Sequence, residues 1–600
     1  MTKLKQRNEI SDKFKWDLSP LTKSDEEWEM RYKAALKKVD DIKKYNGLLS
    51  QSGDVLLNCF KETSELEEEI GKLFVYANLK HDENTINPTY QALSSKASTL
   101  YVSYSTATSF ISPEIISIGK EAINKFTKEN KELEVYAHFF DDLFREADHI
   151  LSLDKEQILA MAQEISAAPS SIFSMVNNAD IKFAPAKNSD NESVEVTHGQ
   201  FINLLQSKDR VLRKSAYETY YNSFIAQKNT IAETYNYSVK KDIFYSKVRN
   251  YPSALQASLS SNNISVSIYK NLIKTVNDNL HLFHEYVGLR KKILKLNKQH
   301  MYDIYVPLII DADQQIDYET AKSTIVKALQ PLGGEYIEIL SRAFNESWID
   351  VYENQNKRSG AYSWGTYGAN PFILMNYTNK VNDMFTLAHE MGHALHSYYT
   401  CSEQPFIYGN YTIFLAEIAS TVNESLLINY LLKTTQDKTM YNYLINYFIE
   451  QFRGTLFRQT MFAEFELITH EKLEANEPLT SDILNEIYKD LIIKYFGDSV
   501  ELDERIPYEW SRIPHFYNPF YVYQYATGFS AAIAISKQIL EEGDVARERY
   551  IDLLKSGSSN YSIDILKKAG LDMTSSKPIE DAMSVFAELL NKLRDSLNIK

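Results

Sequence analysis

Residues 386–396 read TLAHEMGHALH and contain the pattern HExxH at His389–His393. On an α-helix, residues four positions apart lie about 40° apart around the axis, so His389 and His393 project from one face. Two imidazoles placed in this way can bind one Zn²⁺ ion. Glu390 is rotated by about 100° from His389, which suits a general base acting on a water beside the metal. The alternative is that both histidines only pack or form hydrogen bonds, and the surrounding sequence must decide.

A catalytic zinc site needs a third protein ligand and an open position. The metzincin pattern is excluded, because His396 and Tyr399 stand where it has its Gly and its third His. Glu417 is the candidate third ligand, since it lies in an apolar segment where an unpaired carboxylate is costly. Glu424 lies on nearly the same helix face and is predicted to orient a ligand imidazole. A surface glutamate is the alternative there. His396 lies one turn beyond the pair, and we expect it to pack or to support the ligands.

The segment 359–380, just upstream, interrupts the helical pattern with three glycines and a proline. Two runs within it, Ala361–Trp364 and Phe372–Tyr377, have β-strand character. One interpretation of Phe372–Tyr377 is a strand at the edge of a cleft, where an extended peptide binds by main-chain hydrogen bonds. The other interpretation is an ordinary hairpin.

The segment 513–528, IPHFYNPFYVYQYATG, is dense in tyrosine and holds one histidine. Zinc-assisted hydrolysis of an amide passes through a tetrahedral oxyanion, and hydrogen-bond donors aimed at that oxygen lower the barrier. Tyr hydroxyls and His N–H groups are suitable donors. The alternative is that the tyrosines pack in a hydrophobic core.

Composition predicts long helices. The 600 residues include only 19 Gly and 15 Pro, about half of the typical usage of roughly 7% and 5%. Apolar residues recur at helical spacing through most of the chain, and a hairpin is predicted within 180–198. We place an N-terminal helical region at residues 1–200 and a catalytic domain with the HExxH helix at 201–600. The acidic run Glu65–Ile70 is interpreted as a solvated helix face.

The charge balance narrows the partners. The chain has 65 Lys+Arg against 80 Asp+Glu, a net charge of −15. An acidic surface repels phosphate backbones and anionic bilayers, so neither nucleic acid nor a membrane is an expected partner. No apolar run reaches the roughly 18 residues of a membrane span, and the first residues lack the apolar core of a secretory signal. With only two cysteines, Cys59 and Cys401, the chain is predicted to be cytoplasmic.

Several ordered segments together resemble oligoendopeptidase F, a bacterial member of the thimet oligopeptidase-like zinc metallopeptidases. The matching segments are WDLS at 16–19, RNYPSAL at 249–255, 359–399 with HEMGHALH, AEIAST at 416–421, HFYNPFYVYQYATG at 515–528 and SGSSNYSIDILKKAGLDM at 556–573. The resemblance implies a large, mainly helical, two-lobed peptidase. It also implies a deep central channel and a small β-sheet beside the zinc-site helix.

The resemblance also implies roles for individual residues. The zinc ligands would be His389, His393 and Glu417, binding one ion, with Glu390 as the catalytic base. Substrate binding and oxyanion stabilisation would fall to His515, Tyr521 and Tyr525.

The two tyrosine assignments depend on a one-residue gap in the match to the thimet oligopeptidase pattern. Tyr517 and Tyr523 therefore compete with Tyr521 and Tyr525. A further Tyr of the wider family is replaced here by Gly528, so that role is absent or filled by a neighbour.

The expected function is zinc-dependent hydrolysis of internal bonds in short unfolded oligopeptides. A carboxypeptidase or dipeptidyl carboxypeptidase on a related scaffold is the alternative, and it needs a cation for the substrate carboxylate. Arg453, Arg458 and Arg512 are candidates for that cation. A peptide-binding scaffold with a vestigial metal site is disfavoured, because only Gly528 departs from the expected pattern. The sequence leaves the oligomeric state open.

Overall fold

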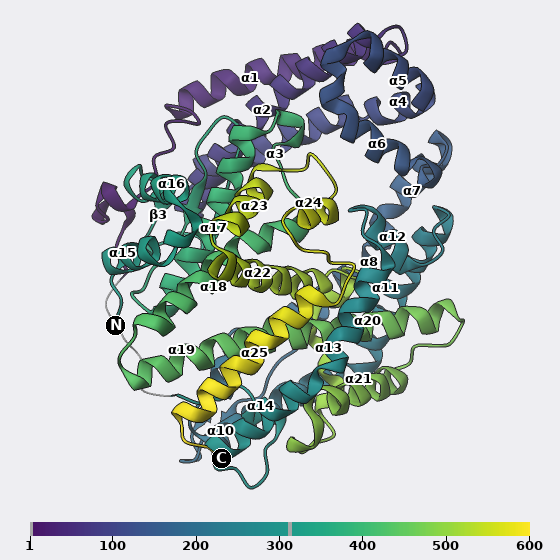
Figure 1. Ribbon diagram of the computed structural model, residues 1–600. Coiled ribbons are helices and arrows are strands. Elements are labelled where there is room, and N and C mark those ends of the chain that lie inside the picture. The colour runs from purple at the N-terminus through teal and green to yellow at the C-terminus, as the bar shows by residue number, and fades with distance from the viewer. Residues whose placement is uncertain (1–3, 310–314, 600) are drawn as a thin grey trace. The chain divides into compact units, whose positions relative to one another are not determined.

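The computed structural model describes residues 4–309 and 315–599, which form a mainly helical protein with a few short strands (Figure 1). The chain divides into two compact units, each assembled from three segments. Unit 1 comprises Met1–Ala147, Asp313–Tyr430 and Ile535–Leu571, and unit 2 comprises Asp148–Ala312, Leu431–Ala534 and Asp572–Lys600. The domain boundary expected near residue 200 falls inside unit 2, and it stays a prediction.

Unit 1 holds the small sheet and most of the N-terminal helices. Its elements are α1 (Asp25–Ile42), α2 (Gly53–Glu83), α3 (Pro88–Thr108), α4 (Ile111–Ile118), α5 (Lys120–Glu129), α6 (Ala137–Arg145), α15 (Tyr318–Ala328), α16 (Gly334–Asn345), β3 (Ile349–Asp350), β4 (Tyr362–Trp364), β5 (Phe372–Leu374), α17 (Val381–Glu403), α23 (Asp544–Lys555) and α24 (Ser562–Lys568).

Unit 2 is also mainly helical and includes a two-stranded hairpin. Its elements are α7 (Leu153–Ser166), α8 (Ala168–Met175), β1 (Ala186–Lys187), β2 (Ser193–Val194), α9 (Phe201–Leu205), α10 (Arg210–Ala226), α11 (Lys228–Val248), α12 (Ala254–Ser260), α13 (Val266–Asp278), α14 (Leu280–Ile293), α19 (Lys438–Gln451), α20 (Arg458–Glu474), α21 (Ser481–Phe496) and α25 (Lys577–Ser596). The unit boundaries at residues 430 and 534 fall within α18 (Ile413–Thr434) and α22 (Tyr523–Glu542).

Helix α2 illustrates why these segments are helical. The Ser52 side chain accepts a hydrogen bond from the Val55 N–H and so caps the first turn. Apolar residues then recur at helical spacing, and Leu66, Ile70 and Leu73 are buried in a core shared with α1 and α3. These three helices lie together in Figure 1 and form one wall of unit 1.

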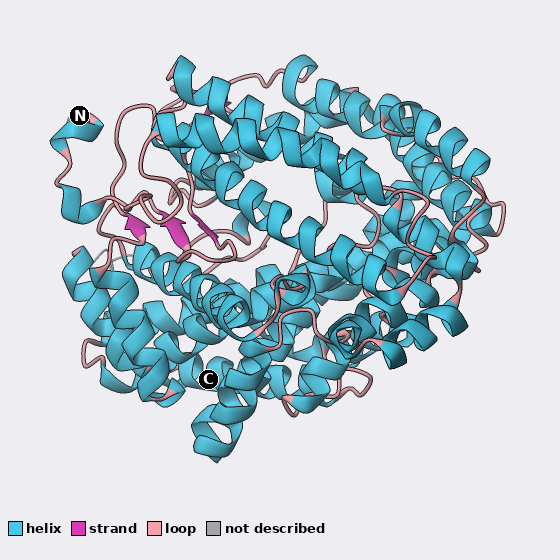
Figure 2. Cartoon of the chain, turned by 90° about the horizontal axis from the view of Figure 1, so that it is seen from above, coloured by secondary structure: helices cyan, strands magenta, loops and turns pink. Residues whose placement is uncertain are grey.

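The sheet of unit 1 has the strand order β3-β5-β4. Strand β5 pairs in parallel with β3 and antiparallel with β4, where Ser363 lies opposite Ile373. Figure 2 shows these strands as a small patch among helices. Of the two interpretations of Phe372–Tyr377, the hairpin is confirmed, because β5 pairs antiparallel with β4, and the edge strand is wrong. Strand β5 ends at Leu374 and is the central strand, because β3 arrives from a segment more than twenty residues earlier. Strand β4 therefore forms an outer edge of the sheet, and no further described strand pairs with it.

The predicted hairpin within 180–198 is confirmed, since β1 and β2 pair antiparallel with Ala186 opposite Val194. The mainly helical class and the small sheet packed on α17 are confirmed as well. Among the described helices, none combines the length and apolar character needed to cross a bilayer.

Candidate metal centre and active site

Helix α17 carries the HExxH pattern, and Asp383 fixes where the helix begins. The backbone N–H groups of Thr378 and Lys380 donate to the Asp383 carboxylate at 2.7 and 3.0 Å. This closes the turn that joins β5 to α17 and satisfies N–H groups near the helix start. The two histidines therefore lie at a fixed distance from the sheet.

Gly392 lets a second helix approach α17 closely. A Cβ atom at this position would lie 2.5 Å from the Cα of Ser420 and 2.6 Å from the carbonyl oxygen of Ala419, both on α18. Only a residue without a side chain allows the two backbones to come this near. The close approach brings Glu417, three residues before Ser420, up to the histidine face of α17.

The side chains of His389, His393 and Glu417 converge. The two histidine Nε2 atoms are 3.2 Å apart, and the Glu417 Oε2 atom lies 3.7 Å from that of His389 and 4.0 Å from that of His393. Zinc bonds of about 2.0–2.1 Å at tetrahedral angles place ligand atoms about 3.3 Å apart. The donor set of two imidazoles and one carboxylate therefore fits a Zn²⁺ ion in both chemistry and spacing. Within the described residues it is the one group of three candidate ligands found this close together.

Neighbouring groups hold the ligands in place. The Nδ1 atom of His389 lies 2.5 Å from Glu424 Oε1, the hydrogen bond predicted for Glu424. His393 is hydrogen-bonded to the backbone carbonyl of Ala416. The Asn423 side chain, buried between α17 and α18, donates to the Ala388 carbonyl at 3.1 Å. Such contacts fix the ring orientation of metal-binding histidines.

The protonation of these side chains follows from burial and from these contacts. Burial opposes a charge on His389, but the hydrogen bond to Glu424 and the nearby carboxylates raise its pKa to about 9. Burial lowers the pKa of His393 to about 3, and the positive charge on His389 contributes. Burial raises the pKa of Glu390 to about 7, against the opposing effect of His389. A carboxyl group with this pKa can both accept and release a proton near neutrality.

Glu390 is 7% exposed and faces strand β4. The backbone N–H of Ser363 donates a hydrogen bond to its carboxylate. Ser363 lies on β4, whose other edge pairs with β5, so the free edge of β4 runs past the proposed base.

His396 does not belong to the donor group. It is fully buried, its ring stacks on Tyr411 at 3.6 Å, and neither ring nitrogen has a hydrogen-bond partner among the described residues. Burial lowers the pKa of His396 to about 3, so it is neutral. The structure therefore shows His396 in the packing role that was expected for it. Tyr411 in turn donates to the His393 carbonyl at 3.4 Å.

The candidate oxyanion donors belong to unit 2. His515 lies in a short 3₁₀ helix, Pro514–Tyr517, and Tyr525 in the first turns of α22. The His515 ring centre is 6.4 Å from that of Tyr521 and 6.2 Å from that of Tyr525, and the two tyrosine hydroxyls are 3.5 Å apart. Burial lowers the pKa of His515, so its imidazole is neutral near pH 7 and keeps an N–H donor.

The two competing tyrosines lie in the core of unit 2. Tyr517 stacks on Phe173 at 4.4 Å, and its buried hydroxyl has no hydrogen-bond partner among the described residues. Tyr523 is 2% exposed and packs against Tyr269 at 5.1 Å. The polar cluster therefore contains His515, Tyr521 and Tyr525, while Tyr517 and Tyr523 serve the hydrophobic core.

Sequence reasoning missed three contributors to the metal centre. Asn423 stands out afterwards as a polar residue in the apolar run of α18, and this was a usable signal. Tyr411 lies in a loop, and nothing in the sequence around it indicated a role. The Ser363 contribution is a backbone N–H, which no side-chain motif reports.

Two family models match the chain. Residues 203–585 match the model described as peptidase family M3, and residues 114–183 match the one described as oligopeptidase F. The oligopeptidase PepF of Bacillus subtilis is 48% identical over 99% of this chain and 89% of that protein. The group B oligopeptidase PepB of Streptococcus agalactiae is 41% identical over 98% of each chain.

Solved structures agree with these matches. A putative peptidase from Chlamydophila abortus superposes with a TM-score of 0.92 at 34% identity, covering 99% of this chain and 100% of the other. The oligoendopeptidase-F of Enterococcus faecium gives a TM-score of 0.74 at 39% identity, with 96% and 100% covered. The chain therefore belongs to the metallopeptidases of family M3. Within that family its full-length relatives include oligopeptidase PepF and an oligoendopeptidase-F, which confirms the resemblance seen in the sequence.

Proposed function

We propose that this peptidase is a zinc-dependent endopeptidase that hydrolyses internal bonds of short, unfolded oligopeptides. The observation that carries the proposal is the convergence of His389, His393 and Glu417 beside the buried carboxylate of Glu390. These three residues would hold one Zn²⁺ ion. When bound, the ion would act as a Lewis acid on the scissile carbonyl and lower the pKa of a water towards 7.

Glu390 would move the proton. Its buried carboxylate, beside the three proposed ligands, is placed to take a proton from the attacking water and return it to the leaving amine. The Ser363 N–H holds the carboxylate toward β4 and so fixes where that transfer takes place. The hydrogen bonds to Glu424 and to the Ala416 carbonyl would hold the rings of His389 and His393 in place while Glu390 gains and loses its proton.

His515, Tyr521 and Tyr525 are proposed to bind substrate and to stabilise the oxyanion. Two observations support these roles: the residues lie in the family motif at 515–528, and their rings cluster within unit 2. A neutral histidine and phenolic hydroxyls donate hydrogen bonds without adding a fixed charge.

The free edge of β4 is proposed to hold the substrate main chain. An extended peptide that adds to an exposed strand is bound through backbone groups, so many side chains are tolerated. The edge runs past Glu390 through Ser363, so a peptide bound there passes the proposed base.

The alternative of a carboxypeptidase needs a cation for the substrate carboxylate, and the candidates are already paired. Arg458 and Arg512 both donate to Glu509, at 2.7 and 2.8 Å. Arg453 donates to Glu450 at 2.7 Å. Each arginine would have to leave an existing ion pair before it could hold a substrate carboxylate. We therefore favour cleavage of internal bonds.

Zinc as the metal and the cytoplasm as the location belong to this proposal. The cysteines Cys59 and Cys401 form no disulfide, which suits a reducing compartment.

The test is cleavage of a length-graded peptide series with acetylated and amidated ends, followed by mass spectrometry. We expect internal cuts in the shorter peptides, loss of activity with a zinc chelator and recovery on adding Zn²⁺. Glu390→Gln should keep its zinc and lose turnover by about 10³-fold, since proton transfer contributes about 10²–10⁴. Cleavage restricted to free C-termini, or wild-type turnover in Glu390→Gln, would overturn the proposal.

A further inference from the structure

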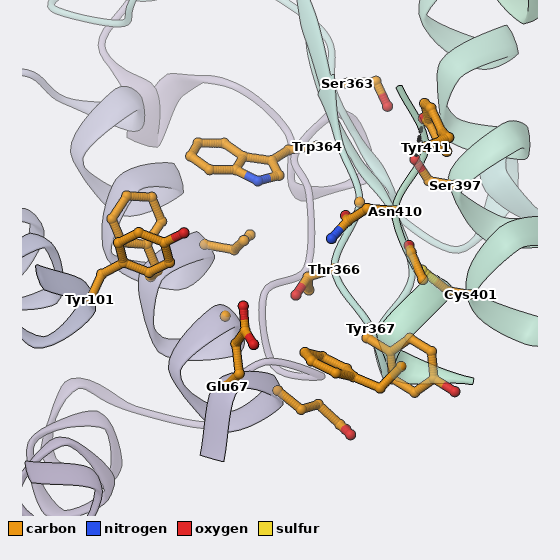
Figure 3. A pocket seen from close by; sticks show the side chains of 17 residues that line it. Glu67, Tyr101, Ser363, Trp364, Thr366, Tyr367, Ser397, Cys401, Asn410 and Tyr411 are labelled. Atoms are coloured by element: carbon orange, nitrogen blue, oxygen red, sulfur yellow. Dashed lines mark hydrogen bonds between the residues drawn. The ribbon is translucent and has the colours of Figure 1, made fainter. Parts of the chain in front are cut away.

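Unit 1 contains a cavity of about 510 Å³ beside the metal centre. One wall is formed by α2 and α3, and the opposite wall by β4 with the loop after it and by the second half of α17 (Figure 3). In the close-up, Glu67 and Tyr101 face the open space from one side, and Trp364, Ser397, Cys401 and Tyr411 come from the other.

Glu67 supplies an uncompensated negative charge to this cavity. Its carboxylate accepts a hydrogen bond from the Tyr104 hydroxyl at 2.9 Å, and among the described residues it forms no ion pair. Glu68, the other acid lining the cavity, is paired with Lys72 at 2.7 Å. No Lys, Arg or His lines the cavity within the described part of the chain. Burial raises the pKa of Glu67, as expected for a carboxylate that lacks a cationic partner.

The interpretation of Glu65–Ile70 as a solvated face therefore holds for exposed Glu65 and is wrong for Glu67. Helical spacing sends the two side chains in different directions, because residues two apart do not share a face.

Aromatic rings surround the space that Glu67 faces. The ring of Phe74 lies 5.9 Å from that of Tyr101 and 5.9 Å from that of Trp364. Aromatic faces attract cations, Trp most strongly, and the attraction grows when the cation is desolvated. A carboxylate beside such rings is matched to an ammonium or guanidinium group on an apolar stem.

The cavity adjoins the catalytic elements. Ser363, which lines it, donates its backbone N–H to Glu390, and Tyr411, also in its wall, contacts the His393 carbonyl. Ser397 and Cys401 line the cavity on α17, four and eight residues after His393, so this wall lies about 6–12 Å along the helix from that ligand. An extended peptide covers that distance in about two to four residues.

We propose that this cavity is a specificity pocket for a cationic group of the substrate, either a Lys or Arg side chain a few residues from the scissile bond or the peptide's terminal ammonium. Glu67 is the counter-ion, and Trp364, Tyr101 and Phe74 form the apolar and cation-binding walls. The inference rests on the proposed peptidase function and adds a substrate preference to it.

The test compares acetylated, amidated peptides in which one Lys is moved along an otherwise neutral sequence, each paired with its norleucine counterpart. Norleucine keeps the stem and removes the charge. At one or two positions we expect the wild-type kcat/KM to favour Lys by about tenfold, the size of one charge-assisted contact. A neutral peptide with a free amino terminus, compared with its acetylated form, tests the terminal ammonium.

Glu67→Gln should reduce the Lys-to-norleucine ratio to about one. The matched control is Glu65→Gln, two residues earlier on the exposed face of α2, which should keep the full ratio. Trp364→Leu, a second variant in case Glu67→Gln misfolds, should lower the ratio severalfold through loss of the ring.

A wild-type ratio near one at every position and at the amino terminus, or a ratio retained in Glu67→Gln, overturns the pocket assignment. Failure of the proposed function gives a different result, in which no peptide is cleaved. Fluorescence anisotropy of labelled Lys and norleucine peptides on the zinc-loaded protein then still decides whether the cavity selects cations. Equal affinities for the Lys and norleucine peptides would reject the proposal that the cavity selects cations.

Discussion

Glu424 shows how a residue outside the donor group sets the properties of the centre. Its carboxylate accepts a hydrogen bond from His389 Nδ1 at 2.5 Å, which leaves Nε2 directed at His393 and Glu417. Replacing Glu424 by Ala should weaken zinc binding by about 10–100-fold, the usual effect of removing such a partner. Glu424→Gln keeps an acceptor oxygen and should lose less. Competition with a chromophoric chelator measures both affinities.

The control for this prediction is Glu403→Ala, which removes an exposed carboxylate from the last turn of α17. Its zinc affinity should equal that of the wild type. Equal affinities for Glu424→Ala and Glu403→Ala would show that Glu424 does not support His389.

The tyrosine cluster gives a second prediction at the residue scale. Tyr525→Phe removes a hydroxyl 3.5 Å from that of Tyr521 and should lower kcat by about 10²-fold with a smaller change in KM, as for other oxyanion donors. Tyr517→Phe removes a buried hydroxyl without a partner among the described residues, so kcat should stay at the wild-type value. Peptide-cleavage kinetics on the two variants show which of the two tyrosines supplies the donor. The reverse ranking would assign the donor role to Tyr517.

Residues defined by spacing along one helix were predictable, and those defined by packing were not. The four-residue interval of His389 and His393 is enough to place both on one face. The Ser363 N–H reaches Glu390 only because β4 pairs with β5, a contact that sequence spacing does not encode. The preference that we propose for Tyr525 over Tyr517 likewise rests on the core of unit 2, where Tyr517 packs on Phe173.

At the scale of elements, the metal centre depends on how closely α17 and α18 pack. Gly392→Ala would place a methyl group 2.5 Å from the Cα of Ser420, so the helices must separate. Overpacking of this kind costs about 1–3 kcal/mol, and a shift of about 1 Å in a catalytic geometry can cost 10²-fold in rate. We expect a lower urea midpoint, weaker zinc binding and a large loss of activity together.

Gly334→Ala is the matched control, because a Cβ atom there meets nothing within 4 Å and the residue starts α16 in the same unit. Its urea midpoint, zinc affinity and activity should match the wild type. If Gly392→Ala also retained wild-type zinc affinity, the close approach of the two helices would not be what places Glu417.

At the scale of the whole molecule, the sequence predicted the class of fold, but it did not predict how the chain divides into two units. Scarce glycine and proline with helical periodicity predicted a mainly helical protein, because those signals are local. Units 1 and 2 each combine three distant segments, and no change of composition marks where the chain leaves one unit and enters the other. The small sheet shows the same limit, since β5 pairs with β3 across a long sequence separation.

Metal binding should be measurable as stability of the intact chain. A ligand that binds only the folded protein stabilises it by about 4 kcal/mol at a thousandfold excess over its Kd. For a unit of this size that is a rise in Tm on the order of 5 °C. Differential scanning calorimetry with and without Zn²⁺ should show the rise in the wild type and in Glu390→Gln, since Glu390 is not a ligand, and none in His393→Ala. An equal rise in His393→Ala would place the ion elsewhere, although the described residues offer no other group of three such ligands.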